Sequence, residues 1–230
     1  HEEGTIDFSL IVKNIDDIVE QKTEDDFGIK SYIQFSVGKI GEVDVDEDGD
    51  ENVKDEESQN DNQSNTIINK INSNLSLKES VRYFSEDNIP VGIGPHPPKV
   101  GEETKYRVYW DLTNTLHELN ELKVEVELPA GISWVETDTV SVGTIVHDDI
   151  SSRVVWNIGR LPSSVREANA QFDISVNPNE DNKDKIMILL PGSKVSAIDK
   201  VTESQVGQTT KAKTTKLMDD DIAIGDGVVE

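Results

Sequence analysis

Short runs in which apolar and polar residues alternate fill the stretch from residue 100 to residue 162. The run at 122–128 reads Leu-Lys-Val-Glu-Val-Glu-Leu, so its apolar side chains all fall on one face of a strand. Gly, Pro, Asn and Asp separate these runs and predict the turns between them. One apolar and one polar face per strand is typical of an antiparallel sandwich, so the chain is predicted to be all-β.

The same alternation predicts strands in the rest of the chain. The predicted strands cover residues 78–84, 104–113, 121–128, 132–136, 142–146, 153–158, 170–176, 185–190, 194–201 and 208–216. Residues 114–120 and 179–184 are predicted to be loops. These elements predict one complete sandwich over residues 76–217, a scaffold that by itself specifies no reaction.

Several residues of this stretch match the pattern of a known family. They are Gly101, Tyr106, Asn114, the Leu-Pro-Ala-Gly run at 128–131, Trp156, Gly159 and Leu161. With them, residues 80–217 resemble the Ig-like conserved repeat of prokaryotic cell-surface proteins, the domain of unknown function eleven. The bridge at 116–120, Leu-His-Glu-Leu-Asn, departs from the pattern, because the family tends to have a shorter turn containing Gly. The resemblance implies an extracellular stalk or envelope protein of tandem Ig-like domains, and it brings no catalytic residues.

Two alternating runs also precede the predicted sandwich, at residues 5–13 and 30–37. The first contains Phe-Ser-Leu-Ile-Val at 8–12, which parallels Phe-Asp-Ile-Ser-Val at 172–176. An internal repeat explains this likeness, so residues 1–75 are predicted to be part of a preceding sandwich. Half a sandwich leaves an apolar face and open edges uncovered. Either the missing strands lie upstream in a longer protein, or these strands add to the second sandwich.

Residues from about 42 to 65 are almost all Asp, Glu, Asn, Gln and Ser, which predicts a long loop or a disordered insertion. Within it, alternate carboxylates and a Gly suggest a calcium loop, because hard cations take oxygen ligands at such spacings. The candidate ligands are Asp44, Asp46, Asp48, Asp50 and Asp55. No helical pattern flanks the loop, so it is not an EF-hand, and a solvated acidic linker explains the same residues. Residues 218–230 are predicted to be an acidic linker or tail.

The charge balance narrows the partners of the chain. Its 46 acidic and 22 basic residues give a net charge of −24, which argues against binding to nucleic acid or to anionic membranes.

The chain has no cysteine, which excludes disulfides and thiolate metal sites. No apolar run is long enough to span a bilayer. Because the sequence begins with His1 and not Met, we expect a mature or excised piece of a longer protein.

The residues that usually carry catalysis form no recognisable group. The four histidines share no strand face, and the sequence around His147 is predicted to be a hairpin turn. Trp110 and Trp156 are predicted to fill the core, whereas Trp134 is the candidate for a ligand-binding face. We therefore expect no enzyme, no certain cofactor and only possible calcium.

The favoured function is a structural or adhesive module, a spacer or stalk in a prokaryotic extracellular or cell-surface protein. Its partners would be neighbouring domains and possibly a surface glycan or protein. The alternatives are a glycan- or protein-binding module and an accessory domain of a secreted hydrolase.

Overall fold

The computed structural model describes residues 28–32 and 65–230, which fall into two units. The small unit contains two short strands, β1 (Gly28–Ser31) and β2 (Ile67–Lys70). They pair in antiparallel register from Gly28 opposite Lys70 to Ser31 opposite Ile67. The prediction that residues 1–75 belong to a preceding repeat rests mostly on residues outside the described ones, and it stays a prediction.

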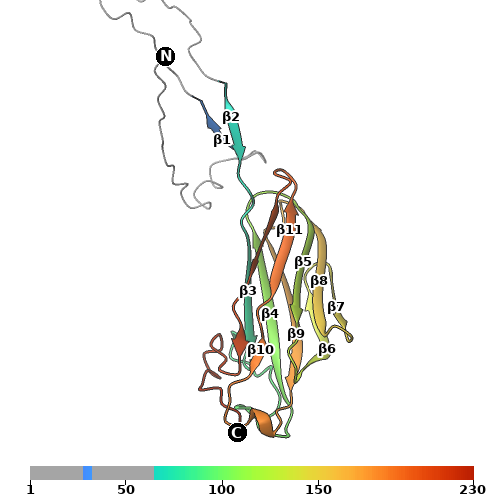
Figure 1. Ribbon diagram of the computed structural model, residues 1–230, viewed down its shortest axis with the longest axis vertical. Helices are drawn as coiled ribbons and strands as arrows, with labels where there is room; N and C mark the ends of the chain where they lie inside the picture. The colour runs from blue at the N-terminus through green and yellow to red at the C-terminus, as the bar shows by residue number, and fades with distance from the viewer. Residues whose placement is uncertain (1–27, 33–64) are drawn as a thin grey trace, which may run out of the picture. The chain divides into compact units, whose positions relative to one another are not determined.

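The large unit, residues 72–230, is a sandwich of two antiparallel sheets, which confirms the predicted all-β, Ig-like class (Figure 1). The four-stranded sheet contains, in spatial order, β3 (Leu75–Arg82), β4 (Thr104–Asn114), β9 (Glu167–Val176) and β6 (Ile132–Val140). The five-stranded sheet contains β12 (Gln205–Thr209), β11 (Lys194–Asp199), β5 (Leu119–Glu127), β8 (Arg153–Leu161) and β7 (Thr144–Asp148). Each sheet therefore ends in two edge strands, β3 and β6 in one and β12 and β7 in the other.

The core lies between the sheets and follows from the alternation of the strands. Along β4 every second side chain is buried, so Tyr106, Val108, Trp110 and Leu112 face the other sheet. Trp110 and Trp156 are fully buried and their rings stack 6.5 Å apart, as predicted for core residues. Burying large side chains of this kind removes most of their apolar surface from water, which is the main stabilising term of such a sandwich.

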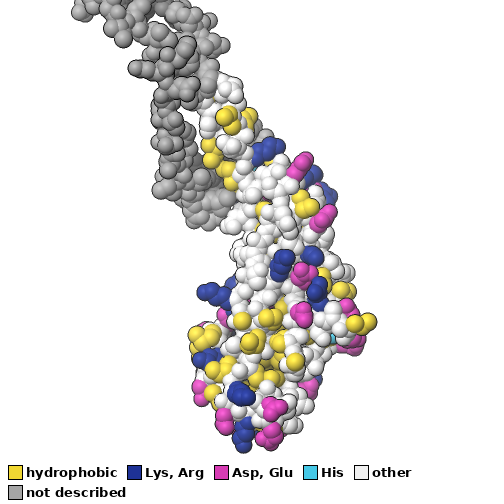
Figure 2. Space-filling view, viewed as in Figure 1, with side chains coloured by type: hydrophobic (Ala, Val, Ile, Leu, Met, Phe, Trp, Pro, Cys, Tyr) yellow, Lys and Arg dark blue, Asp and Glu magenta, His cyan; other side chains and the backbone are white. Residues whose placement is uncertain are grey.

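Smaller elements cover one end of the sandwich. They are β10 (Ile188–Leu190), β13 (Lys213–Thr214) and a 3-10 helix over Glu180–Asn182. Residues 217–230, the C-terminal segment, pack here, and Figure 1 marks the C-terminus at this end. Figure 2 shows hydrophobic side chains gathered over this lower part of the visible face.

The prediction of a linker at residues 218–230 is wrong. Val229 is fully buried, Ala223 is 7% exposed and the side chain of Asp220 lies in the interior. The Val229 N–H donates to the Lys185 carbonyl, which fastens the segment beside β10. The segment contributes apolar and polar anchors to the sandwich, although its acidic composition is typical of a solvated tail.

Candidate functional site

On each side of the sandwich an edge strand of one sheet meets an edge strand of the other, and the two sides are held together by different interactions. On one side of the sandwich, β3 and β12 face each other, and the Gln208 amide donates to the Leu77 carbonyl oxygen at 2.7 Å. Beside this bond lies Glu79, which is 4% exposed although it is a carboxylate. Hydrogen bonds of a side-chain amide and a buried carboxylate therefore hold β3 and β12 together on this side.

Hydrogen bonds from both sheets satisfy the buried carboxylate of Glu79. It accepts from the Trp110 indole at 2.9 Å, from the Thr210 hydroxyl at 2.9 Å and from the Ser193 hydroxyl. Buried charges are tolerated when hydrogen bonds replace the lost water. Glu79 is thus a structural bridge between β3 and the β11–β12 hairpin, and it has no access to a substrate.

The opposite side of the sandwich, between β6 and β7, is held by aromatic stacking. Trp134 from β6 stacks on His147 from β7, with ring centroids 5.6 Å apart and planes 11° apart. On the core side it stacks on Phe172 at 5.0 Å. Trp134 is only partly buried, and it lines a pocket of about 260 Å³ together with His147, Glu136 and Asp149. We call this the edge pocket.

The edge pocket combines an apolar wall with a polar rim. Leu128 and Ile132 join Trp134 in the wall, whereas the carboxylates of Glu136 and Asp149 lie at the rim. Asp149 is almost fully exposed and its Oδ1 lies 3.1 Å from His147 Nδ1. The pocket can therefore hold the stem of a side chain and present negative charge to its end. The prediction of Trp134 as a ligand-binding residue stays a prediction, now with a defined pocket beside it.

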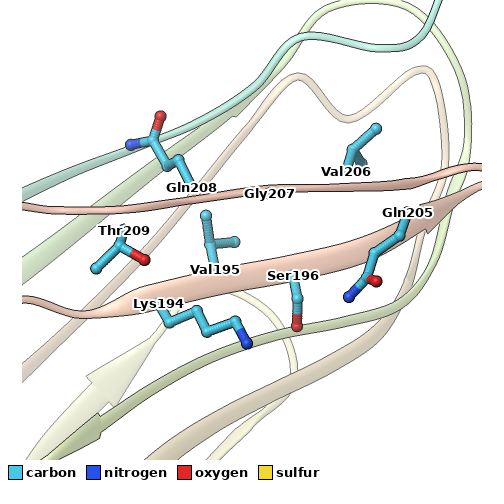
Figure 3. Close-up of a pocket in the computed structure, with 8 residues that line it drawn as sticks. All are labelled: Lys194, Val195, Ser196, Gln205, Val206, Gly207, Gln208 and Thr209. Atoms are coloured by element: carbon cyan, nitrogen blue, oxygen red, sulfur yellow. The ribbon is translucent and has the colours of Figure 1, made fainter.

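A second hollow, of about 300 Å³, lies across β11 and β12 on the outer face of the five-stranded sheet (Figure 3). Within the hollow, Gly207, which has no side chain, lies opposite Ser196, whose side chain is small. Lys194, Ser196 and Gln205 lie on the same side of the hairpin in Figure 3. A methyl group at Gly207 would collide with the Val195 carbonyl oxygen, so glycine is required by the close approach of the strands.

A buried polar cluster fastens the beginning of the sandwich. Asp199 Oδ2 accepts from the Ser73 backbone N–H at 2.7 Å and lies 2.9 Å from His117 Nδ1. Its Oδ1 accepts from the backbone N–H groups of Val201 and Thr202. Burial raises the pKa of Asp199, but these hydrogen bonds outweigh burial, so the pKa lies below its usual value.

This cluster contains a serine, a histidine and an aspartate, yet its geometry is not that of a catalytic triad. The Ser73 hydroxyl accepts from the His117 backbone N–H at 2.7 Å, and the imidazole contacts Asp199. The three residues are 5%, 1% and 0% exposed. A triad needs a hydroxyl that donates to the imidazole and is open to substrate, so we assign the cluster a structural role and call it the Asp199 latch.

Asp220 fastens the C-terminal segment in a similar way. Its Oδ2 accepts from the backbone N–H groups of Tyr83 and Phe84 at 2.8 and 2.7 Å, just beyond the end of β3. Its Oδ1 accepts from the N–H groups of Ile222 and Ala223. Burial raises the pKa of Asp220, but the four hydrogen bonds lower it further than burial raises it. Asp220 thereby links the end of β3 to the C-terminal segment.

The predicted calcium ligands do not lie in the part of the chain that the structure describes. Asp44, Asp46, Asp48, Asp50 and Asp55 lie outside the described residues, so the calcium loop stays a prediction. In the ranges 28–32 and 65–230, no group of three or more His, Asp or Glu side chains is arranged to hold a metal ion. No helix in these ranges is long and apolar enough to cross a membrane.

Sequence reasoning missed the buried carboxylates. Glu79 and Asp199 lie in phase with the apolar residues of their strands, which was a usable signal, because a charge on the apolar face must find partners. Asp220 gives no such signal, since it sits among three consecutive aspartates in a segment without alternation.

No family model matches the sequence, and no curated protein matches it. Among solved structures, the chain is similar to the major pilin subunit BcpA of Bacillus cereus, with 10% identity and a TM-score of 0.41 over 64% of this chain and 44% of that chain. It is similar to the full-length major pilin SpaD of Corynebacterium diphtheriae, with 11% identity, a TM-score of 0.39, and coverage of 61% and 35%. The type V pili tip protein Mfa5 of Porphyromonas gingivalis gives 14% identity, a TM-score of 0.36, and coverage of 43% and 22%. The chain thus spans less than half the length of each of these structures.

Proposed function

We propose that this chain supplies a non-catalytic, load-bearing Ig-like module to a prokaryotic extracellular or cell-surface protein, where it acts as a spacer or stalk. The family resemblance of residues 80–217 supports the location, and the way the sandwich is fastened at its two ends supports the load-bearing role. Neighbouring domains of the same protein are its first partners.

The observation that carries the proposal is the position of Asn72 and Glu230, the two ends of the large unit, relative to β3 and β4. β3 pairs with β4 at eight consecutive positions, from Leu75 opposite Asn114 to Arg82 opposite Arg107. Glu230 lies at the other end of this pair, where its backbone exchanges hydrogen bonds with Pro98 and Val100. A pull between Asn72 and Glu230 therefore runs along the strands.

This direction of pull loads the strand pair in shear. Hydrogen bonds of an antiparallel pair are perpendicular to the strands, so a pull along the strand axis strains all of them together. The Asp199 latch holds Ser73 immediately before β3, and Asp220 holds the backbone immediately after it. Both ends of the loaded strand are thus anchored by buried carboxylates, as a spacer under tension requires.

Single-molecule force spectroscopy on the full chain tests the proposal. The chain has no cysteine, so Asn72→Cys with Glu230→Cys gives a unique pair of attachment points at opposite ends of β3. In the matched control, Asp87→Cys with Glu230→Cys pulls on the turn that follows β3, at the same end as the C-terminus. This control peels β3 from β4 one pair at a time.

We expect the first pair of attachment points to rupture at a several-fold higher force than the control pair, at the same loading rate. Forced unfolding is governed by the unfolding rate, which depends on how many bonds must break together. Equal rupture forces in the two directions would refute a load-bearing role for the β3–β4 pair.

A further inference from the structure

Three of the four edge strands of the sandwich are protected against pairing with another chain. β3 and β12 cover each other through the Gln208–Leu77 and Thr210–Glu79 hydrogen bonds. Proteins protect sheet edges because an unpaired row of N–H and C=O groups is a template for an added strand.

β6 is protected by an irregularity in its own backbone. Its register with β9 shifts between Val135 and Asp138, so Glu136 and Thr137 have no partner across the ladder. Such bulges twist an edge away from a flat pairing geometry. Glu136 and Asp138 add charge to the same stretch, which further disfavours an added strand.

β7 contacts β6 through the stacking of His147 on Trp134, but it has neither the cross-sheet hydrogen bonds of β3 and β12 nor the register shift of β6. It pairs with β8 without a register shift from Thr144 opposite Asn157 to Asp148 opposite Arg153. Its five residues include no Pro, no Gly and no Lys. Val146 is 50% exposed on it, and Ile150 in the following turn is 97% exposed. Within residues 28–32 and 65–230, no strand other than β8 pairs with β7. Its outer edge is therefore a regular, partly apolar template.

The edge pocket lies directly beside this template and indicates which side chain would accompany an added strand. The wall formed by Trp134 and Ile132 suits an aliphatic stem, and the rim carboxylates of Glu136 and Asp149 suit a positive charge. Lys and Arg combine the two, because they bury their stems and keep the charged end near water. A volume of about 260 Å³ accommodates one such side chain.

We propose that the β7 edge and the edge pocket together form a binding site for an extended, basic peptide segment of another protein. The segment adds to β7 as a strand, its main chain pairing with the outer edge and one Lys or Arg entering the pocket. Main-chain pairing gives affinity and the pocket gives specificity in this mode of recognition.

Charge argues against a second copy of the chain as the favoured occupant. Two copies of a chain whose net charge is −24 repel one another. A basic segment has the complementary charge for the rim, so the site is suited to a different protein.

The test uses the full chain and the peptide acetyl-Lys-Thr-Val-Thr-Lys-Thr-Val-Thr-Lys-amide, labelled for fluorescence anisotropy, at about 0.15 M salt. Two control peptides replace the central Lys with Glu or with norleucine. A third is N-methylated at alternate residues, which removes the main-chain donors of a strand. We expect saturable binding of the first peptide, at least about tenfold weaker binding of the Glu peptide, and loss of binding on N-methylation.

Charge reversal then separates the site from general attraction between a basic peptide and an acidic protein. The variant Glu136→Lys with Asp149→Lys should bind the Lys peptide at least about tenfold more weakly and gain affinity for the Glu peptide. The matched variant Glu121→Lys with Glu203→Lys changes the net charge equally at two exposed positions outside the edge pocket, one on β5 and one in the turn between β11 and β12. It should bind the Lys peptide as the unmodified chain does.

Three results would overturn the proposal. Equal weakening by both double variants would show that binding follows net charge alone. Unchanged binding of the N-methylated peptide would exclude strand addition. Sedimentation that shows a dimer of the unmodified chain, lost in Glu136→Lys with Asp149→Lys, would assign the edge to a second copy. None of these results bears on the force measurements, so the spacer function is tested separately.

Discussion

Replacing Asp199 by Asn is the sharpest test of how the beginning of the sandwich is held. The carboxylate is 0% exposed and accepts four hydrogen bonds, from Ser73, His117, Val201 and Thr202. Asn has nearly the same shape, so the substitution opens no cavity. It replaces one accepting oxygen with an NH₂ group, which cannot accept hydrogen bonds. Two of the four donors therefore lose their partner.

The expected cost follows from these two donors. A buried donor left without an acceptor costs about 1–3 kcal/mol, so Asp199→Asn should lower the free energy of unfolding by about 2–6 kcal/mol. Domains of this kind have total stabilities of about 5–15 kcal/mol. The variant should thus remain folded near neutral pH but unfold at a clearly lower urea concentration.

Urea unfolding of the full chain, followed by tryptophan fluorescence, measures this loss. The control Asp138→Asn changes an exposed aspartate on β6 and should stay within about 0.5 kcal/mol of the unmodified chain. A loss below about 1 kcal/mol for Asp199→Asn, at an unchanged urea dependence, would show that the latch does not hold the sandwich together.

The difference in stability between the unmodified chain and Asp199→Asn should also depend on pH. The folded-state pKa of Asp199 lies below the value of about 3.9 that an unfolded Asp has. A carboxylate with a lowered pKa contributes stability above the unfolded value, and this stability is lost as the pH falls through the folded value. The difference in stability between the unmodified chain and Asp199→Asn should therefore shrink as the pH is lowered from about 4. A difference independent of pH between 7 and 2 would contradict the assigned cause.

The remaining predictions concern other fastenings of the molecule. Asp220→Ala should release the C-terminal segment, so proteinase K, which does not need the Lys or Arg that residues 217–230 lack, should cleave that segment faster while the sheets stay protected. Trp110→Phe removes a donor from a buried carboxylate and should cost at least about 1–3 kcal/mol in urea unfolding. Gly207→Ala forces a methyl group against a strand carbonyl. The free energy of unfolding should fall by about 1–3 kcal/mol, which a lower melting temperature would show. Millimolar calcium should raise the melting temperature, and the rise should disappear when Asp46 and Asp48 are both changed to Asn; an unchanged melting temperature would make the acidic stretch a solvated insertion.

Most of the strands of the sandwich could be predicted because alternation is a local property. Predicted strands at 104–113 and 153–158 match β4 and β8 closely, and Trp110 and Trp156 fill the core as expected. The boundaries were less certain where alternation fades. The predicted strand at 208–216 is replaced by β12, which ends at Thr209, and by the two-residue β13.

The sequence by itself determined the fold class, because burying one face of each strand is dictated by the period-two pattern of its own residues. It also indicated Trp134 as the candidate for a ligand-binding face, which stays a prediction. Only the tertiary structure decided which edges are closed, since that depends on residues far apart in the chain: Asp220 holds Tyr83, and Glu79 holds Ser193. The tertiary structure also decided the edge pocket, because its lining combines residues of β6 in one sheet with residues of β7 and the turn after it in the other. Local composition cannot show such partners, because a hydrogen bond or a shared pocket exists only once the strands are packed.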